Sequence, residues 1–418
     1  MPNIVDGCRM PAADSFPLSP AQLGIWYAQH MDPLVPIVIA QYVDLHGELD
    51  LVILEQATID AAMEMGSGFL EIIEHAGEPR QIVSPTLGAT LEYVDLRSAI
   101  DPDSAAQSWM KADYGSPIDL IDDRLIRGAV LQLEDHRWYW YARAHHIVLD
   151  AFGARTLMTR ISELYSAAVT GTEPPAGRAD HPRSLYESEI DYRGSTRFET
   201  DRAHWAERMR GFTRGTSPAV HSAPPAPVNG FSRAALTTEQ DALLDRAVQR
   251  HDSSPAGLVI GGFAAYLAQL NGTESVNLSL PVTARTTAAM RRSGGMLSNI
   301  VPLRLRLAHD ITLIELLDHV RVQVSGALRH QRYRFEDIRR DSTGAEMVTT
   351  EFFGPRLNIM LFQNEVTLGP LVGQYHVLST GPADDMNVNF YQNVAGSSNL
   401  IDLEYNPDVY TEDEARAH

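Results

Sequence analysis

Hydrophobic and polar positions follow two different periods along this chain of 418 residues. Short runs of β-branched and aromatic residues predict strands at 42–45, 69–73, 81–83, 127–133, 137–144, 232–236, 276–280, 357–362 and 400–405. Apolar residues at helical spacing after a capping residue predict helices that start at Ser19-Pro20, Asp50, Asp150, Thr238, Ser254-Pro255 and Thr312. Helices and strands alternate loosely, so we expect a mixed α/β fold.

The chain is long enough for two domains of roughly 200 residues each. A proline-rich stretch at 218–227 cannot pair or coil regularly, which predicts a boundary there. We expect a leader at 1–15, an N-terminal lobe at 16–175, a connection at 176–230 and a C-terminal lobe at 231–418. Thr411 and Glu414 form a capping-box pattern, but we expect the chain to stop before that helix can form, as in a domain excised from a larger protein.

The acidic composition argues against several classes of function. Thirty-four basic and fifty-four acidic side chains give a net charge of −20, which would repel a nucleic-acid backbone. No apolar run reaches the roughly 18 residues that a membrane helix needs, and the N-terminus lacks a secretion signal pattern. We expect a cytoplasmic protein that binds neither membrane nor nucleic acid. The single cysteine, Cys8, excludes an internal disulfide and argues against a thiol nucleophile or a cysteine-rich zinc site.

One segment reverses the acidic trend. Two acidic residues, Glu336 and Asp337, lie among five arginines, which are Arg329, Arg332, Arg334, Arg339 and Arg340. The segment has two interpretations: a solvated helix end, or a patch for a phosphate or an acidic partner protein. Arginine suits the second interpretation because its planar fork matches the geometry of phosphate oxygens.

The most informative segment is HHIVLDAFG at 145–153, which places two histidines shortly before an aspartate. An aromatic strand precedes it and a helical pattern follows it, so the polar cluster lies at a strand-to-helix junction. Neighbouring residues on an extended backbone point to opposite faces, which argues against His145 and His146 sharing one metal ion. We expect one of them to face a cleft and the other the interior.

Six motifs in order resemble those of the condensation domains of nonribosomal peptide synthetases, which are more distantly similar to chloramphenicol acetyltransferase. The tandem-histidine segment is similar to the HHxxxDG motif of that family, and the resemblance covers nearly the whole chain. The other five motifs are SPAQLGIWYAQ at 19–29, LPVTAR at 280–285, SNIVPLRL at 298–305, HQRYRFEDI at 330–338 and LNIMLFQN at 357–364.

The resemblance implies a V-shaped pair of acetyltransferase-like lobes with a central tunnel. An acyl or peptidyl thioester donor and an aminoacyl thioester acceptor enter from opposite ends, each on the phosphopantetheine arm of a carrier protein. The acceptor amine attacks the donor carbonyl and forms an amide, without a metal, a nucleotide or another intrinsically bound cofactor. The implied partners are the two carrier proteins and an adenylation domain of the same synthetase, and we expect the domain to be monomeric.

Within the motif, His146 is the candidate catalytic residue. An imidazole titrates near pH 6.5, so His146 can act as a general base, or it can position the amine against an already activated thioester. His145 is expected to be structural. The resemblance implies that Asp150 forms an architectural ion pair with Arg285, since a buried aspartate without its cation is costly. Taken alone, Arg285 is equally well interpreted as a surface charge.

Two departures from the family pattern concern the site. Ala151 stands where the family usually has glycine, two residues before Gly153; a right-handed helical backbone would tolerate alanine, whereas a positive φ would cost about 1 kcal/mol. The family's arginine-histidine-glutamate motif is replaced by MGSGFLEII at 65–73, which leaves the donor-side subclass open. Asn299 and Thr380 are candidates for polar groups on the acceptor side, with structural hydrogen bonding as the alternative for both.

Two other functions stay open. The fold could transfer an acyl group onto a soluble hydroxyl or amine, as stand-alone HxxxD acyltransferases do, or it could be a non-catalytic module that docks carrier proteins. The opening and late motifs favour condensation, and the intact His146 argues against a docking module. We expect the regions of Gly294-Gly295 and Gly381-Pro382 to cross between the lobes, because such loops need a permissive backbone.

Overall fold

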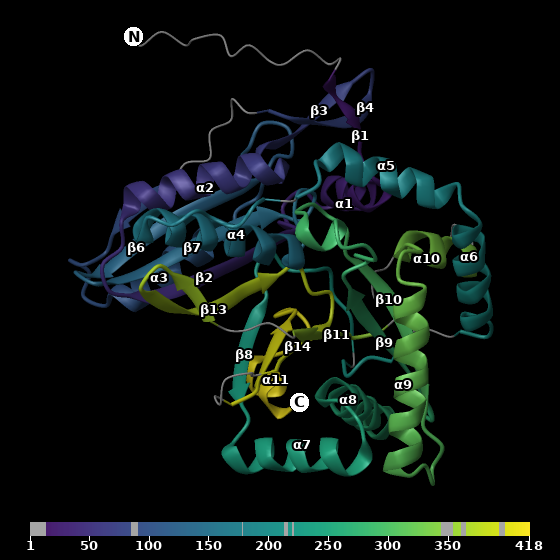
Figure 1. Ribbon diagram of the computed structural model, residues 1–418. Helices are drawn as coiled ribbons and strands as arrows, with labels where there is room; N and C mark the ends of the chain where they lie inside the picture. Colours follow the sequence, from purple (N-terminus) through teal and green to yellow (C-terminus); the bar gives the residue numbers. More distant parts are fainter. Residues whose placement is uncertain are drawn as a thin grey trace.

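The computed structural model describes residues 14–84, 91–177, 179–212, 216–219, 221–343, 354–360, 365–392 and 398–418. Its helices and strands build two lobes, each around a six-stranded sheet, and a small three-stranded sheet lies at one end (Figure 1). The mixed α/β fold expected from the sequence is confirmed. Most of the expected leader, including Cys8, lies outside the described residues.

The sheet of the first lobe takes strands from both halves of the chain. Its order is β12-β13-β2-β7-β6-β5, with β5 parallel to β6 and the other neighbours antiparallel. Strand β13 pairs with β2 from Gln374 opposite Asp44 to Thr380 opposite Ile39. A hairpin from the C-terminal half therefore completes the N-terminal sheet. The strands are β2 (Val38–His46), β5 (Leu91–Asp95), β6 (Ile126–Glu134), β7 (Arg137–His145), β12 (Glu365–Leu368) and β13 (Leu371–Thr380).

Helices cover both faces of this sheet with apolar side chains. Helices α2 (Leu51–Met65) and α4 (Ala151–Thr170) pack on one face, where they bury Trp138 and Trp140 of β7. Helix α3 (Pro102–Tyr114) packs on the other face against Tyr139 and Tyr141. The predicted starts of α2 and α4 are confirmed, because Asp50 and Asp150 cap their first turns. A glycine in the left-handed conformation ends each of these helices.

The remaining elements of the N-terminal half surround this lobe. Helix α1 (Pro20–Met31) has the expected start at Ser19, which forms a capping box with Gln22. The three-stranded sheet has the order β1-β4-β3, and two helices follow in the connection between the lobes. These elements are β1 (Phe16–Pro17), the 3-10 turn η2 (Ser67–Phe69), β3 (Leu70–His75), β4 (Glu78–Val83), α5 (Pro182–Arg193) and α6 (Thr196–Arg208).

The second lobe has a sheet of order β10-β9-β11-β14-β15-β8, in which β11 runs parallel to β9 and β14. Its strands are β8 (Gly230–Ala235), β9 (Ser275–Val282), β10 (Asn299–Arg306), β11 (Arg356–Met360), β14 (Met386–Tyr391) and β15 (Leu400–Tyr405). Its helical elements are α7 (Thr238–His251), α8 (Pro255–Asn271), the 3-10 turn η4 (Met290–Arg292), α9 (Leu313–Arg329), α10 (Phe335–Thr343) and α11 (Glu412–Ala417).

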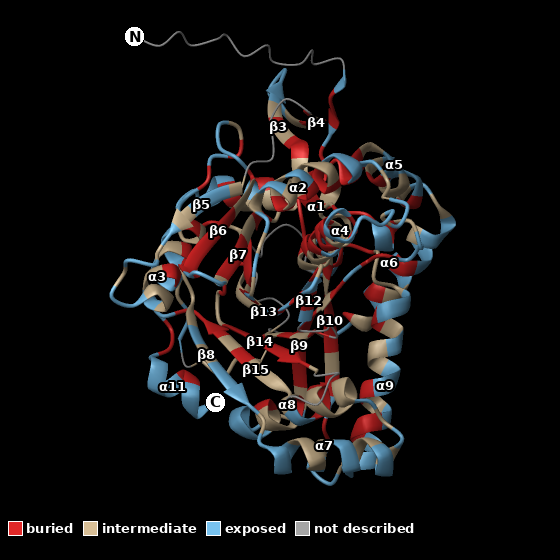
Figure 2. Ribbon diagram, turned by 60° about the vertical axis from the view of Figure 1, so that its left-hand side comes forward, coloured by how far each residue is buried: buried red, intermediate tan, exposed pale blue. Residues whose placement is uncertain are grey.

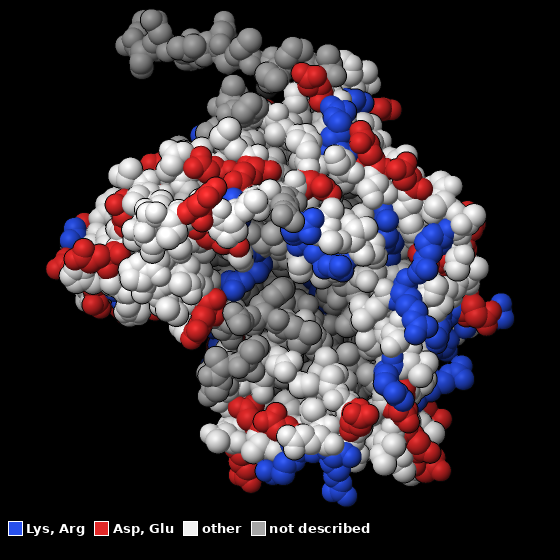
Figure 3. All heavy atoms as spheres, in the orientation of Figure 1, with Lys and Arg blue, Asp and Glu red and all other residues white. Residues whose placement is uncertain are grey.

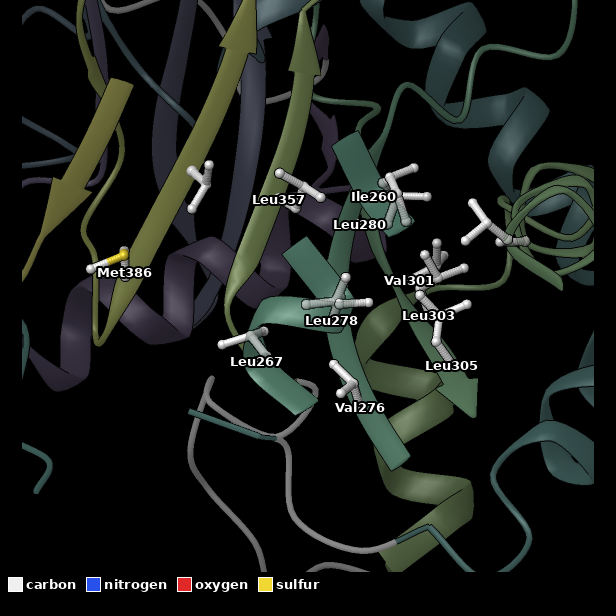
Figure 4. Close-up of a cluster of buried hydrophobic side chains, with 14 of the residues drawn as sticks. Ile260, Leu267, Val276, Leu278, Leu280, Val301, Leu303, Leu305, Leu357 and Met386 are labelled. Carbon is white, nitrogen blue, oxygen red and sulfur yellow. The ribbon is translucent and has the colours of Figure 1, made fainter. Parts of the chain in front are cut away.

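The core of the second lobe lies between one face of this sheet and helices α8 and α9. Figure 4 shows Ile260 and Leu267 with Leu278, Val301 and Leu357 in this cluster. Burial is concentrated in the sheets and in the inner faces of the helices (Figure 2). Alternate residues of β9, β11, β14 and β15 point into the core, so the residues between them point to the opposite face of the sheet.

The expectation that no helix forms after Thr411 is wrong. Helix α11 follows it as a short C-terminal helix, and its capping box is complete, with hydrogen bonds in both directions between Thr411 and Glu414. Ala415 is fully buried against the core of the second lobe. Tertiary packing therefore stabilises a helix that would be too short to form alone.

Candidate active site

The tandem histidines lie where β7 ends and α4 is about to begin. The backbone N–H of His146 donates to the carbonyl oxygen of Ile37 at 2.8 Å, which continues the pairing of β7 with the start of β2. His146 lines a cavity of about 1140 Å³, whereas His145 is fully buried among other residues. The expectation that one histidine faces a cleft and the other the interior agrees with this geometry.

His146 is a neutral imidazole held by the crossing strand. Its Nε2 lies 3.3 Å from the carbonyl oxygen of Thr380, the last residue of β13. A carbonyl oxygen can only accept a hydrogen bond, so Nε2 carries the proton and Nδ1 keeps the lone pair. Burial lowers the pKa of His146 to about 4, although the Thr380 carbonyl opposes that shift. The ring therefore stays uncharged at neutral pH.

His145 anchors the active-site segment to helix α1. Its Nδ1 accepts the backbone N–H of Ile147 at 3.1 Å, so Nε2 donates to the Oε1 of Gln29 at 2.9 Å. Burial lowers the pKa of His145 to about 3. Gln22, also on α1, donates to the carbonyl oxygen of Ile147 at 2.9 Å. Sequence reasoning missed both glutamines, although their seven-residue spacing places them on one face of a helix.

Asp150 and Arg285 form an ion pair that joins the two lobes. Their oxygen and nitrogen lie 2.6 Å apart, and the two side chains are almost fully buried. Asp150 also accepts backbone N–H groups from Gly153, Leu297 and Ser298. Burial by itself would raise the pKa of Asp150, but the Arg285 guanidinium and these hydrogen bonds hold it below its ordinary value. Asp150 is therefore occupied by this junction and does not contact His146.

Small residues allow the segments around His146 to approach closely. Ala151 is the first residue of α4 and has no positive φ, so the backbone tolerates alanine there. A Cβ at Gly153 would lie 3.1 Å from the carbonyl oxygen of Gly295. Gly381 has a φ of 102°, and a Cβ there would lie 3.3 Å from Nε2 of His146. The two glycine regions expected to cross between the lobes thus both contact the active-site segment.

Asn299 and Thr380 both line the cavity, and hydrogen bonds within the protein occupy the Asn299 side chain and the Thr380 backbone. The buried Oγ1 of Thr380 has no hydrogen-bond partner among the described residues. Asn299 donates to the carbonyl oxygens of Gln331 and Tyr333 and accepts the N–H of Phe335. The backbone of Thr380 joins His146 to Glu404 on β15, whose Oε2 accepts the Thr380 N–H at 3.2 Å. Asn299 thus holds a loop, and Thr380 connects the second sheet to the histidine.

The five arginines between 329 and 340 do not form one exposed patch. Arg334 is 5% exposed and donates to the carbonyl oxygen of Leu297, and Arg332 pairs with Glu189. Arg340 is exposed but pairs with Asp337. Basic side chains do gather over α6 and α10, while acidic side chains border α2 (Figure 3). The cavity is lined by Arg334, Arg339 and Arg340, but not by Arg329 or Arg332.

Both lobes contribute to the wall of the cavity. The first lobe supplies His146, Ala151 and Phe152, and the second lobe supplies Arg356 and Asn387 from β11 and β14. Sequence reasoning missed the last two residues. The signal was present, because polar and apolar residues alternate in each of these strands.

The described residues contain no group of three or more histidine, cysteine, aspartate or glutamate side chains placed to hold a metal ion. No helix among them has the length and apolar composition of a membrane span.

Comparison with known sequences identifies the family. A family model described as Condensation domain matches residues 12–417. The dimodular nonribosomal peptide synthase of Bacillus subtilis (strain 168) is 31% identical over 408 residues, which cover 96% of this chain and 17% of that protein. Enterobactin synthase component F of Escherichia coli (strain K12) is 30% identical over 393 residues, which cover 92% of this chain and 30% of that protein. The chain therefore spans less than a third of the length of these relatives.

Solved structures agree with the sequence comparison. A variant of the starter condensation domain of rhizomide synthetase, in complex with C8-CoA, matches with a TM-score of 0.90 and 32% identity, covering 97% of this chain and 92% of that one. The first condensation domain of the calcium-dependent antibiotic synthetase, in complex with a substrate analogue, matches with a TM-score of 0.88 and 28% identity, covering 97% and 94%. The likeness thus extends over both lobes.

Proposed function

This chain belongs to the condensation-domain family of amide-forming acyltransferases, and we propose that it joins a carrier-bound acyl or peptidyl donor to a carrier-bound aminoacyl acceptor beside His146. One observation carries this proposal. His146 is the histidine of the tandem pair that borders the cavity between the lobes. The Thr380 carbonyl holds its ring, and the Thr380 N–H is in turn bound by Glu404 of the second sheet. The products and partners of the whole synthetase depend on the parts of the relatives that this chain does not span.

The reaction forms a C–N bond and breaks a C–S bond. The acceptor amine attacks the donor carbonyl, the amine gives up one proton, and the departing sulfur of the phosphopantetheine arm takes one up. Neutral His146 supports this step through Nδ1, which accepts a hydrogen bond from the attacking amine and aims it at the carbonyl. A ring with a pKa of about 4 is a weak base. We therefore assign His146 the role of positioning the amine, with the activation of the thioester supplying much of the driving force.

The ion pair between Asp150 and Arg285 supports the histidine indirectly. Asp150 caps α4, while Arg285 ties that cap to the loop that carries Gly295. Substrates attached to flexible arms gain from a rigid site, because a displacement of 1 Å at the reacting atoms can cost about a hundredfold in rate. Both residues are positioning residues in this proposal.

The direct test uses two carrier proteins loaded with defined thioesters, and mass spectrometry detects the condensed product. We expect His146→Ala to lower the rate by about a hundredfold or more, as the loss of amine positioning predicts, whereas His136→Ala, at an exposed turn, should leave it unchanged. Absence of product with the unaltered chain would favour a docking module. Transfer of the acyl group to a soluble nucleophile would favour a stand-alone acyltransferase.

Carrier recognition is assigned to the mouth of the cavity at α10. Arg339 and Arg340 line the cavity and Arg340 is also exposed, so the proposal keeps these two members of the arginine cluster for contact with an acidic carrier protein. We expect Arg340→Glu to slow condensation of carrier-bound acceptor more than that of a small thioester mimic, most clearly at low salt. An equal loss on both substrates would contradict this assignment.

A further inference from the structure

One face of the second sheet is polar although most of its members are buried. We call it the polar sheet face; its members alternate with the core residues of the same strands. They are Asn277 and Ser279 on β9, Arg356 and Asn358 on β11, Asn387 and Asn389 on β14, and Asp402 and Glu404 on β15. The strand register places Arg356 opposite Asn387, and Asn387 opposite Glu404. A row of polar side chains thus crosses the sheet on the side away from α8 and α9.

Some polar groups of the polar sheet face form hydrogen bonds within the protein. Asp402 accepts two hydrogen bonds of 2.6 Å from Arg233 on β8. Glu404 accepts hydrogen bonds from the side-chain amides of Asn229 and Asn389. These contacts are expected, because a buried carboxylate without partners is strongly destabilising.

Arg356 and Asn387 differ from the two carboxylates of this face. Among the described residues, none forms a hydrogen bond or an ion pair with the Arg356 side chain. Asn387 is 4% exposed, and its buried Nδ2 has no partner among the same residues. Both side chains line the cavity that contains His146. Two groups rich in hydrogen-bond donors therefore border this cavity, and neither is satisfied within the described part of the chain.

The charge of Arg356 acts on the active site. Arg356 and His146 line the same cavity, and the guanidinium charge adds to the effect of burial in lowering the pKa of His146. The negative charges of Asp384 and Glu404 partly offset the effect of burial on the pKa of Arg356. Burial also raises the pKa of Glu404, which disfavours its negative charge and so weakens its electrostatic effect on Arg356. The Arg356 side chain is partly exposed and lines the cavity, so a carboxylate that enters the cavity can reach its guanidinium.

We propose that Arg356 and Asn387 form a subsite for a carboxylate on the side chain of one of the two substrates. The inference rests on the function proposed above, since it requires a thioester beside His146. Arginine binds a carboxylate through two parallel hydrogen bonds, and the Asn387 amide can donate a third. The phosphate of the carrier's arm lies at the opposite end of that arm from the thioester. A group near His146 therefore meets the substrate and not the phosphate.

The test measures binding, so it does not depend on turnover. The probes are stable pantetheine amides of aspartate and asparagine that lack the phosphate, each with a free or an acetylated amine to represent acceptor and donor. Isothermal titration calorimetry with the whole chain should show the aspartate probe binding at least tenfold more tightly in one of the two forms, a difference of about 1.4 kcal/mol. Equal affinities for the acid and the amide in both forms would overturn the inference.

Variants assign the preference to the subsite. Arg356→Gln should bring the affinity ratio of acid to amide close to one, and the nearly isosteric Asn387→Asp should do the same by placing a negative charge beside Arg356. The control Arg306→Gln alters an exposed arginine on β10 and should keep the ratio. A ratio that survives both subsite variants would overturn the inference. A preserved acid preference without any condensation product would instead count against the proposed function.

Discussion

The two six-stranded sheets bury their side chains in different ways. The first sheet is covered with apolar side chains on both faces, and its reactive group, His146, stands just beyond the end of a strand. The second sheet has one apolar face and the polar sheet face, whose carboxylates and amides are buried within the sheet. A rigid apolar scaffold thus presents a single reactive ring, whereas the second sheet presents a surface that can distinguish substrates.

This difference suggests that the two sheets have different tasks. An apolar scaffold tolerates little movement, because its side chains are closely packed, and it can hold one ring in place. A buried polar face is costly to maintain, yet its groups can recognise charge. The Asp150–Arg285 pair and the Thr380 backbone connect the two sheets at the histidine.

The largest expected effect comes from breaking the connection between the lobes. Arg285→Ala leaves the buried carboxylate of Asp150 without its cation, so we expect a loss of about 3 to 5 kcal/mol in the free energy of unfolding. Urea denaturation of both proteins measures this change. Arg306→Ala is the matched control at an exposed site and should stay within about 0.5 kcal/mol of the unaltered chain. A similar loss in both variants would contradict an architectural role for the pair.

A second effect concerns the two histidines of the first lobe that have lowered pKa values. The pKa values of His145 and His146 are about 3 and about 4, below the unfolded value of about 6.5. The unfolded chain therefore binds more protons between pH 4 and 6.5, and stability must fall as the pH drops through that window. At pH 5 each histidine should remove roughly 2 kcal/mol relative to neutral pH.

The measurement compares denaturant unfolding at pH 7.5 and pH 5. His145→Gln should lose less stability between the two pH values than the unaltered chain does, because one titrating group is gone. His136→Gln replaces an exposed histidine and should behave like the unaltered chain. Identical pH dependence in all three proteins would mean that His145 is not buried as a neutral ring.

The polar sheet face should respond to pH in the opposite sense. Burial raises the pKa of Glu404 above that of an unfolded glutamate, so its contribution is complete at low pH and is lost as the pH rises through the folded pKa. The free energy of unfolding of Glu404→Gln, relative to that of the unaltered chain, should therefore be higher at pH 8 than at pH 4. We expect this difference to be smaller than the loss of stability that the two histidines produce. Denaturant unfolding at both pH values checks the sign. If the relative stability of Glu404→Gln were lower at pH 8 than at pH 4, the protein would instead stabilise Glu404 as a carboxylate.

The smallest expected effect is at Ala151. Because this residue begins α4 with a helical backbone, Ala151→Gly should destabilise the chain by up to about 1 kcal/mol, and it should not release any strain. Thermal unfolding measures the change. A gain in stability would indicate that the alanine methyl group is strained against the cavity wall.

Local signals predicted much of this fold from the sequence. The helices that begin at Pro20, Leu51 and Ala151 follow capping residues, and the capping interaction depends only on near neighbours. The same signals at Pro102 and Pro182 were overlooked, and α3 and α5 were missed with them. The pairing of β13 with β2 joins residues more than 300 positions apart, which no local pattern can reveal.

The site was partly predictable for similar reasons. Adjacent residues on a strand face opposite sides, which correctly separated the environments of His145 and His146. The surroundings of the arginines at 332 and 334 could not be foreseen, because the glutamate and the carbonyl that bind them come from distant segments. Arg356 and Asn387 were missed because alternation within one short strand gains meaning only when its neighbours in the sheet are known.

The hairpin of β12 and β13 also affects how the chain can be made and rearranged. Strand β2 leaves the ribosome early, but its neighbour β13 follows more than 300 residues later, so one edge of β2 must wait unpaired during most of synthesis. For the same reason, an engineered chimera cut between the lobes would combine four of the six strands of the first sheet from one parent with a hairpin of two strands from the other. A recombination point after Thr380 keeps the first sheet within one parent but takes β14 and β15 of the second sheet from the other, so each of these two cuts divides one of the sheets.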